Sequence, residues 1–428
     1  MPCTVGLNFS PSILVPISGN PNLLSPNSGF SLNNLSIALD LINISFHLKC
    51  IISYNEYLVF LYEFFSYIIN GDFVNKYKVC VYAISKNEEK FVERWVKSMK
   101  EADEIYVLDT GSSDGTVNKL KKLGVNVLEK KIVPWRFDVA RNLSLDMIPK
   151  DADICICTDL DEVFESGWRE KLEKNYIDGA RVSYKYNWHI NEEGIADVSF
   201  LLDKIHPRNG YKWTHPVHEV LTPLREEKRI VIEDIVLNHY PDKNKSRSCY
   251  LKLLELSVEE DPLDDRNMHY LGREYMYYKE WEKCIFTLKK HLSLESATWN
   301  LERSASMRYI ARSYYNLGKL EDSEFWYKRA IKEASYMREG YVELGVLYYN
   351  QGRWFDCVIN LIKALTIVNK PMVYVNEVFS WDNTIDDILS ICYYKLGIKD
   401  LALYHVNKAI NYKSEDRLLN NKKIFMDM

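Results

Sequence analysis

The chain has 428 residues, 47% of them hydrophobic and 27% charged, which is the composition of an ordinary soluble globular protein with two or three domains. The net charge of -5 gives no reason to expect nucleic acid as a partner. The nine cysteines form no CxxC pair, so we expect reduced thiols and a cytoplasmic protein.

Residues 1–75 differ in composition from the rest and are predicted to be an N-terminal extension. The first part is rich in Pro, Ser, Asn and Gly and is typical of a loop or a disordered segment. The apolar stretch at 50–70 is long enough to span a bilayer, but Glu56 and Glu63 interrupt it, and a carboxylate at mid-membrane is costly. The pattern favours a partly buried helix, and membrane contact by this segment is the alternative.

From residue 77 onward, strand and helix patterns alternate at short range. We expect Asn87 to cap the first helix and Gly124 to end the second. The predicted strands are 77–84, 104–109, 125–130 and 153–158, and the helices between them include 116–124 and 138–148. This alternation predicts an α/β domain built on a parallel sheet with helices on both faces.

Carboxylates follow two of these strands directly. Asp109 ends the strand at 104–109, and "TDLDE" follows the apolar run that ends at Cys157. Asp159 and Asp161 alternate with Leu160, so both can point to one side of the sheet edge where such folds bind ligands. Two hard oxygen ligands suit Mg²⁺ or Mn²⁺. The alternative is a solvated acidic loop.

Beyond the polar linker at 237–248 the pattern is helical and repetitive. Gly318 and Gly352 lie 34 residues apart, which is the tetratricopeptide period, and Gly397 opens a further copy. A degenerate copy precedes them at 270–290. Small residues recur at fixed offsets after the glycines, namely Ser323, Cys357 and Ala402, and then Ala330, Ala364 and Ala409. We expect four stacked helical hairpins with a concave surface for a partner, although plain helix packing also explains most of the aromatic residues.

Five motifs occur together in one order between residues 78 and 221: "SKNEE", "DTGSSDGT", "WRFDVARN", "TDLDE" and "PVHEV". On these motifs the chain resembles the family 2 glycosyltransferases of the GT-A fold, with Lys86 where that family usually has Tyr. With its repeats it resembles the sublancin-type peptide S-glycosyltransferases over most of residues 76–410. The resemblance implies a Rossmann-like nucleotide-diphospho-sugar transferase domain at 76–240. An all-α tetratricopeptide-repeat solenoid would follow at 241–428.

The resemblance also implies roles for residues on the donor side. Ile84 and Glu88 would line the nucleoside pocket, and Asp109 would accept a hydrogen bond from the uracil imide. Asp159 would hold the ribose or the sugar, and Arg141 would approach the diphosphate. Two alternatives stay open. Asp109 could be a turn residue, and Arg141 could pair with the neighbouring carboxylates.

The remaining roles concern the metal and the chemistry. Asp161 would bind the metal, and His218 could complete that site or touch the diphosphate. Glu219 is the candidate general base, with Glu162 as its rival. His215 and His218 could instead bind zinc, but Pro216 between them argues against the helix that would bring them together.

The resemblance therefore implies an inverting glycosyltransferase that depends on Mn²⁺ or Mg²⁺. It would move a sugar from a UDP-sugar to a hydroxyl or thiol of a peptide, protein or glycan acceptor, which the repeats would hold. A homo-oligomer is compatible with this sequence. Two other functions stay open: a nucleotidyltransferase, for which a basic Gly-rich phosphate loop is missing, and a non-catalytic repeat scaffold with a relic nucleotide site.

Overall fold

The computed structural model describes residues 76–191, 193–242 and 250–427. The N-terminal extension predicted at 1–75, with its apolar stretch, lies outside the described residues. No helix in the described part of the chain is both long and apolar enough to cross a membrane.

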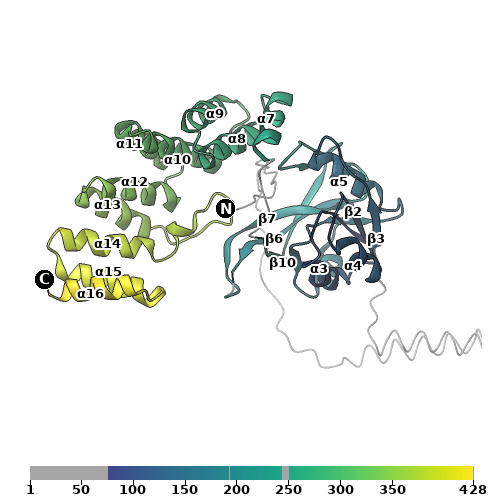
Figure 1. Ribbon diagram of the computed structural model, residues 1–428, viewed down its shortest axis with the longest axis horizontal. Helices are drawn as coiled ribbons and strands as arrows, with labels where there is room; N and C mark the ends of the chain where they lie inside the picture. The colour runs from purple at the N-terminus through teal and green to yellow at the C-terminus, as the bar shows by residue number, and fades with distance from the viewer. Residues whose placement is uncertain (1–75, 192, 243–249, 428) are drawn as a thin grey trace, which may run out of the picture. The chain divides into compact units, whose positions relative to one another are not determined.

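The first domain is built on one mixed eight-stranded sheet, in the order β3-β2-β1-β4-β7-β6-β10-β5 (Figure 1). The strands β1 to β4 are parallel, whereas β7 runs antiparallel to both β4 and β6. The strands are β1 (Val79–Ser85), β2 (Glu104–Asp109), β3 (Asn126–Glu129), β4 (Ile154–Cys157), β5 (Glu162–Phe164), β6 (Ala180–Ile190), β7 (Ala196–Pro207) and β10 (Lys228–His239). A separate pair consists of β8 (Tyr211–Thr214) and β9 (Val220–Pro223).

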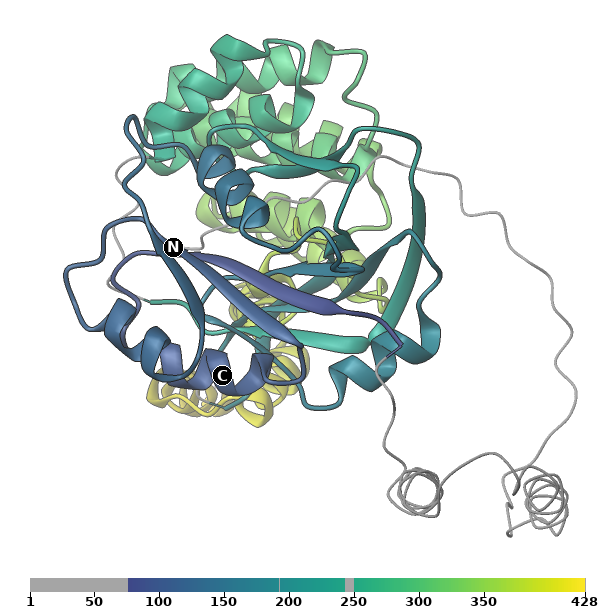
Figure 2. The ribbon, with the colours of Figure 1, turned by 90° about the vertical axis from the view of Figure 1, so that its right-hand side faces the viewer.

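Helices cover both faces of the parallel half of the sheet, as the sequence predicts. On one face lie α3 (Val92–Met99) and α4 (Thr116–Lys122), and on the other lies α5 (Phe137–Asp146) (Figure 2). Alternate residues of β1 enter the two cores: Val79 and Val81 pack with the α3 side, whereas Cys80 and Tyr82 pack with the α5 side. Because both faces are buried, these strands are apolar throughout rather than alternating.

Two sequence expectations need correction. The sheet is mixed rather than wholly parallel, because after residue 158 the chain adds β7, antiparallel to β4 and β6, and β5, antiparallel to β10, while β6 and β10 pair in parallel. Asn87 does not cap a helix. It has a φ of 57°, and its side-chain oxygen accepts a hydrogen bond from the backbone N–H of Ser113 at 2.7 Å. The helix begins later, at Val92.

The second domain is a row of antiparallel helix pairs (Figure 1). The pairs are α8 with α9, α10 with α11, α12 with α13, and α14 with α15, flanked by α7 and α16. Their bounds are α7 (Tyr250–Glu260), α8 (Asp265–Tyr277), α9 (Trp281–Ser293), α10 (Asn300–Asn316), α11 (Leu320–Glu333), α12 (Arg338–Asn350), α13 (Trp354–Leu365), α14 (Thr384–Lys395), α15 (Lys399–Tyr412) and α16 (Asp416–Met426). The four predicted hairpins are therefore confirmed.

The turn of each hairpin requires a left-handed backbone. Gly318, Gly352 and Gly397 have φ values of 74°, 70° and 75°, which glycine adopts without strain. In the first hairpin Lys279 has the same conformation, with a φ of 62°. The small residues predicted at fixed offsets are all fully buried where helices approach closely: Ser323, Cys357, Ala402, Ala330, Ala364 and Ala409.

An insertion between α13 and α14, residues 366–383, interrupts the repeat period. It contacts the first helices of several hairpins. Arg308 of α10 donates to the carbonyl of Val375 at 3.0 Å and pairs with Glu377 at 3.4 Å. The same guanidinium pairs with Glu343 of α12 at 2.6 Å. The insertion therefore covers part of the row of helices that the sequence predicted to be a concave binding surface.

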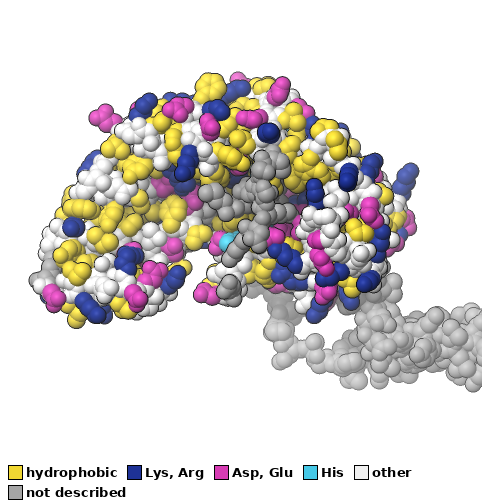
Figure 3. All heavy atoms as spheres, viewed as in Figure 1, with side chains coloured by type: hydrophobic (Ala, Val, Ile, Leu, Met, Phe, Trp, Pro, Cys, Tyr) yellow, Lys and Arg dark blue, Asp and Glu magenta, His cyan; other side chains and the backbone are white. Residues whose placement is uncertain are grey.

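Apolar side chains gather over the helical domain in the space-filling view (Figure 3). Several apolar residues on the second helix of a hairpin are more than half exposed: Phe286, Phe325, Ile359 and Tyr404. Lys and Arg side chains are scattered over both domains in the same view. The two domains also share a packing contact, because Val217 of the sheet domain joins the hydrophobic core of the helices.

Candidate active site

The loops that follow β1 and β2 are bound to each other. Ser85 and Asp109 end these neighbouring parallel strands and lie side by side in register. The backbone N–H of Glu88 donates to Thr116 Oγ1 at 2.8 Å, and Glu89 accepts from the N–H of Gly115 at 3.0 Å. A Cβ on Gly115 would lie 2.5 Å from the Glu89 carboxylate, so a larger residue there would displace that side chain. The motifs "SKNEE" and "DTGSSDGT" therefore form one structural unit.

Asp109 is 1% exposed, and both of its carboxylate oxygens hold the loop that follows β2. Its Oδ1 accepts from the backbone N–H groups of Gly111 and Ser112 at 3.0 and 2.8 Å. Its Oδ2 accepts from the Ser85 and Ser112 hydroxyls. These bonds correspond to the turn role that the sequence left open, and the contact with a uracil imide stays a prediction. Glu88 is buried beside this loop, and Ile84 is half-buried near the end of β1.

Arg141 joins three of the motifs. It comes from α5 and is 3% exposed. Its Nη2 pairs with Asp159 Oδ1 at 2.5 Å, and its Nε pairs with Glu219 Oε1 at 2.9 Å. Burial opposes its charge, but Asp159 and Glu219 hold the pKa of the guanidinium well above its usual range. The pairing with neighbouring carboxylates is thus present, whereas contact with a diphosphate stays a prediction.

A histidine that the sequence did not single out lies against Asp161. His239 ends β10, and its Nε2 is 3.4 Å from Asp161 Oδ2. Within the described residues, His239 Nδ1 is buried without a hydrogen-bond partner. Adjacent ligands of one divalent ion have separations of this order, so an oxygen of Asp161 and a nitrogen of His239 fit one ion. The sequence placed His239 in a linker, which hid it.

His218 and His215 contact the helical domain. The ring of His218 stacks on Tyr270 of α8 with centroids 4.3 Å apart, and its carbonyl accepts from Arg266 at 2.7 Å. His215 lies against Asn267 and Asp264, at 2.9 and 3.4 Å. In the described part of the chain, the group of metal-ligating side chains found within 4.8 Å of one another contains neither histidine. His218 as a metal ligand stays a prediction, while His239 is the histidine next to Asp161.

Glu162, the rival base, is fully buried. Its Oε2 accepts from the N–H of Asp159 at 2.8 Å, and its Oε1 accepts from the Tyr186 hydroxyl at 2.9 Å. Burial raises its pKa, and the nearby Lys204 opposes that rise. These bonds give Glu162 a role in fixing the loop that carries Asp159.

Lys204 is a second residue that the sequence did not reveal. It comes from β7, is 3% exposed, and its Nζ lies 3.9 Å from Asp159 Oδ2. Burial lowers the pKa of this ammonium, but Glu162 and Asp159 outweigh that effect and raise it. Asp159 therefore lies between two cations, Arg141 and Lys204. Such a cluster favours anionic groups nearby.

Comparison with known families decides the class of this domain. The model of the glycosyl transferase family 2 matches residues 80–224, which include all five motifs. Residues 80–224 form a family 2 glycosyltransferase domain. This enzyme class uses a nucleotide-sugar donor and an acceptor, and its members typically use a divalent metal. The search of curated proteins gave no match.

Three solved structures have weak similarity to this chain. A thermophilic TPR protein in Thermus thermophilus, TTC0263, is 18% identical over 42% of this chain and 91% of that chain, with a TM-score of 0.31. MamA is 16% identical over 38% and 80%, with a TM-score of 0.31. YrrB, a TPR protein with an unusual peptide-binding site, is 15% identical over 41% and 83%, with a TM-score of 0.31. The fold of the helical domain therefore rests on its own helix pairing and turn geometry.

Proposed function

We propose that this glycosyltransferase is inverting and metal-dependent, and that it moves a sugar from a UDP-sugar to a hydroxyl or thiol acceptor. One observation carries the proposal. The buried Arg141 holds Asp159, which follows β4, together with Glu219, which precedes β9, and His239 lies against Asp161 of the same acidic motif. Charged groups held this rigidly can stabilise the charge that develops in the transition state when a sugar passes from its donor to its acceptor.

On the donor side, Asp161 and His239 would bind a divalent ion, Mn²⁺ or Mg²⁺. The ion would act as a Lewis acid on the leaving diphosphate. Asp159 is 31% exposed at its side chain, so it is open to a ligand, and it would hold the ribose or sugar. Ile84, Glu88 and Asp109 remain the proposed lining of the nucleoside pocket.

On the acceptor side, Glu219 would take the proton of the attacking hydroxyl or thiol. Its side chain is 12% exposed and is oriented by Arg141. Because one guanidinium holds both carboxylates, Glu219 lies close to Asp159, the proposed sugar-binding residue. A base in this reaction must be near the sugar, since the reacting atoms come within about 3–3.5 Å of each other. Arg141 would therefore act as a positioning residue for both carboxylates.

The acceptor class rests on the resemblance to the sublancin-type peptide S-glycosyltransferases. That resemblance favours a peptide thiol, with a protein or glycan hydroxyl as the alternative, and the helical domain would recruit it. The insertion at 366–383 already covers part of the inner helices, which leaves their remaining surface and the outer helices for an acceptor. The family match favours a transferase over the repeat scaffold that the sequence left open.

Calorimetry of UDP binding tests the donor side. We expect UDP to bind only with Mn²⁺ or Mg²⁺ present, and we expect Asp161→Asn to abolish that binding. Asp151→Asn is the matched control, because Asp151 is an exposed carboxylate that pairs with Lys78. Equal UDP affinity in the presence of a chelator would remove the metal from the proposal. If the enzyme hydrolysed other nucleotide sugars but no UDP-sugar, uridine would be excluded as the nucleoside of the donor.

A further inference from the structure

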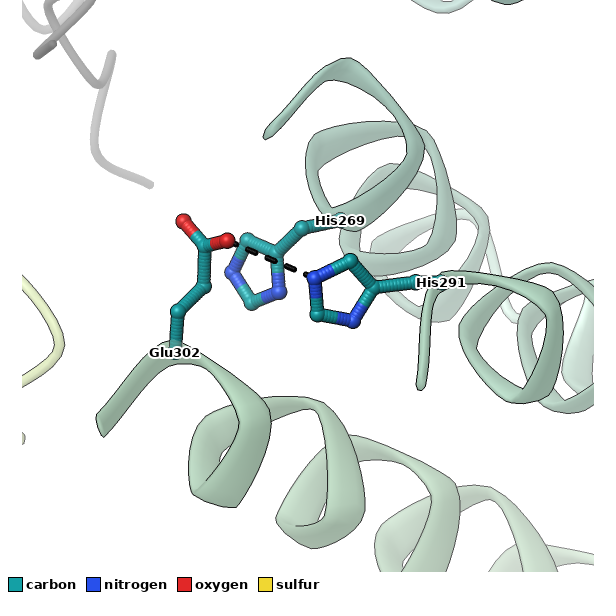
Figure 4. Close-up of side chains that lie close together, drawn as sticks. All are labelled: His269, His291 and Glu302. Atoms are coloured by element: carbon teal, nitrogen blue, oxygen red, sulfur yellow. Dashed lines mark ion pairs between the residues drawn. The ribbon is translucent and has the colours of Figure 1, made fainter. Parts of the chain in front are cut away.

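A second cluster of polar side chains lies inside the helical domain, in a place that the transferase reaction does not use. His269 of α8, His291 of α9 and Glu302 of α10 point toward one another (Figure 4). Their ligand atoms lie within 4.8 Å of one another. They are 0%, 0% and 5% exposed. Three adjacent helices thus place two imidazoles and a carboxylate around one point that is closed to solvent.

The outer contacts of the two imidazoles leave one nitrogen of each ring facing inward. His269 Nδ1 and His291 Nδ1 lie 2.7 and 3.0 Å from the hydroxyl of Ser306. A serine oxygen can accept from both Nδ1–H groups, and each Nε2 then carries a lone pair. Within the described residues, neither Nε2 atom has a hydrogen-bond partner. A buried polar atom without a hydrogen-bond partner destabilises the folded chain unless another group binds it.

The carboxylate is oriented in the same way. Tyr374 of the insertion donates a hydrogen bond to Glu302 Oε2, and Glu302 Oε1 lies 3.4 Å from His291 Nε2. Neutral imidazole with an outer hydrogen bond on the second nitrogen is the usual form of a metal-binding histidine.

The repeat pattern shows that His291 is unusual at its position. In each hairpin the second helix carries a buried residue twelve positions after the left-handed turn residue (279 to 291, 318 to 330, 352 to 364, 397 to 409). The later hairpins have Ala330, Ala364 and Ala409 there, each 0% exposed. Packing at this position is satisfied by a methyl group, so it does not explain an imidazole in the first hairpin.

We propose that His269 Nε2, His291 Nε2 and Glu302 bind one zinc ion that ties the α8–α9 hairpin to α10. Zinc takes this mixture of nitrogen and oxygen ligands, with water in the fourth position of a tetrahedral site. Since the ligands come from three helices, zinc binding stabilises the packing of the first repeat on the second. Without metal, the cluster would be only a hydrogen-bonded network in which His291 and Glu302 form an ion pair.

Zinc content of the full chain tests this site separately from the catalytic metal. The measurement uses the Asp161→Asn protein, so that the strand-end site does not contribute. We expect one zinc per chain after exchange against buffer, and near zero in that background with His269→Gln and His291→Gln added. His405→Gln is the matched control, because His405 is a buried histidine paired with Asp386 at 2.7 Å in the last hairpin. It should keep the zinc.

Stability and spectroscopy give two independent readouts. A strong chelator should lower the unfolding midpoint of the Asp161→Asn chain by about 5 °C or more, and zinc should restore it. If the double variant does not fold, Co²⁺ added to the apo Asp161→Asn chain decides, because a four-coordinate site gives intense visible bands. No bound zinc, equal zinc in a folded double variant, or a midpoint indifferent to chelator together with no Co²⁺ bands would overturn the proposal.

Discussion

The two polar clusters use similar side chains but differ in their access to solvent. At the strand ends, the side chains of Asp159 and Asp161 are 31% and 12% exposed. In the helices, His291 is fully buried and the Glu302 side chain is 7% exposed. A group that exchanges substrate must be reachable, whereas a group that stabilises packing need not be. The exposure of Asp159 therefore distinguishes the candidate catalytic cluster from the candidate structural one, although His239 beside Asp161 is itself 6% exposed.

The two clusters also differ in the charged side chains that surround them. Asp159 lies between Arg141 and Lys204, so the strand-end cluster contains fixed cations. Such cations suit an anionic diphosphate beside a metal ion. In the helical cluster the carboxylate of Glu302 lies against two imidazoles, with His291 Nε2 at 3.4 Å. A dication bound by all three side chains would neutralise this buried carboxylate.

The largest expected effect tests the chemistry of the strand-end cluster. Glu219→Gln keeps the shape and hydrogen bond of the side chain but removes its basicity. Turnover with a hydroxyl acceptor should fall by about 10²–10⁴-fold, while UDP affinity changes little. A thiol acceptor would weaken the effect, because thiols ionise more readily. Glu226→Gln, at an exposed carboxylate nearby, is the control. A fall of less than about tenfold with a hydroxyl acceptor would exclude Glu219 as the base.

A second large effect concerns the stability of the helical domain. Arg308 is 2% exposed and pairs with Glu343 and Glu377 while it binds the insertion. Arg308→Ala removes the buried guanidinium and leaves Glu343 and Glu377 with Arg312 as their remaining arginine partner. The free energy of unfolding in urea should therefore fall by about 1–3 kcal/mol. Arg353→Ala removes an ion pair whose arginine is 41% exposed, and should change little. Equal effects of the two substitutions would show that the buried network does not hold the insertion.

A middle-sized effect decides which histidine serves the catalytic metal. His239→Gln should weaken Mn²⁺-dependent UDP binding by about 10–100-fold, because His239 lies against Asp161. His218→Gln should have a smaller effect, since its ring stacks on Tyr270. Calorimetry at fixed UDP with varied Mn²⁺ measures both. If His218→Gln weakened UDP binding more than His239→Gln did, His218 would be the metal-binding histidine, as the sequence predicts.

A smaller effect depends on pH and involves His206, a buried histidine of the sheet domain. Burial lowers the pKa of His206 to about 3, well below the usual 6.5. The unfolded chain therefore takes up this proton first as the pH falls, so the stabilising effect is complete above pH 6.5 and is lost between about 6.5 and 3. His206 should contribute about 1 kcal/mol per pH unit to the slope of unfolding free energy in that range.

The variant that tests this slope is His206→Gln, measured by urea unfolding from pH 7 to 4.5. His206 Nε2 lies 2.9 Å from the Tyr82 hydroxyl, and its Nδ1 lies 2.7 Å from the carbonyl of Pro207. The substitution lowers stability at pH 7, but its distinguishing result is a shallower slope. An unchanged slope would mean that His206 titrates equally in the folded and unfolded chain.

The sequence predicts the parts of the fold where local pattern and tertiary structure agree. The strand at 104–109 is found at its predicted bounds, and the glycines that mark the predicted repeats lie in the turns of three hairpins. The motifs place Asp109 and Asp159 at strand ends because parallel strands end at one edge. His239 and Lys204 could not be placed, because they come from strands whose antiparallel pairing depends on distant segments.

His291 shows a different reason for a missed residue. The repeat frame makes its unusual position visible only if Lys279 is recognised as the counterpart of the turn glycines. Lysine rarely adopts a positive φ, so nothing in the local sequence marks this turn. The structure restores the frame, because Lys279 has a φ of 62° in the same place as Gly318, Gly352 and Gly397.

The smallest expected effect follows from that turn. Lys279→Gly should stabilise the helical domain by about 1 kcal/mol, because a side chain in the left-handed region costs about 1–2 kcal/mol and glycine's greater freedom in the unfolded chain offsets part of the gain. Gly352→Ala should destabilise the chain in the matching turn of the third hairpin, where φ is 70°. Urea unfolding followed by helical circular dichroism measures both substitutions. If Lys279→Gly lowers stability, the lysine side chain makes a contact that stabilises the chain by more than its backbone strain costs. The first hairpin would then differ from the later ones in its turn as well as at His291.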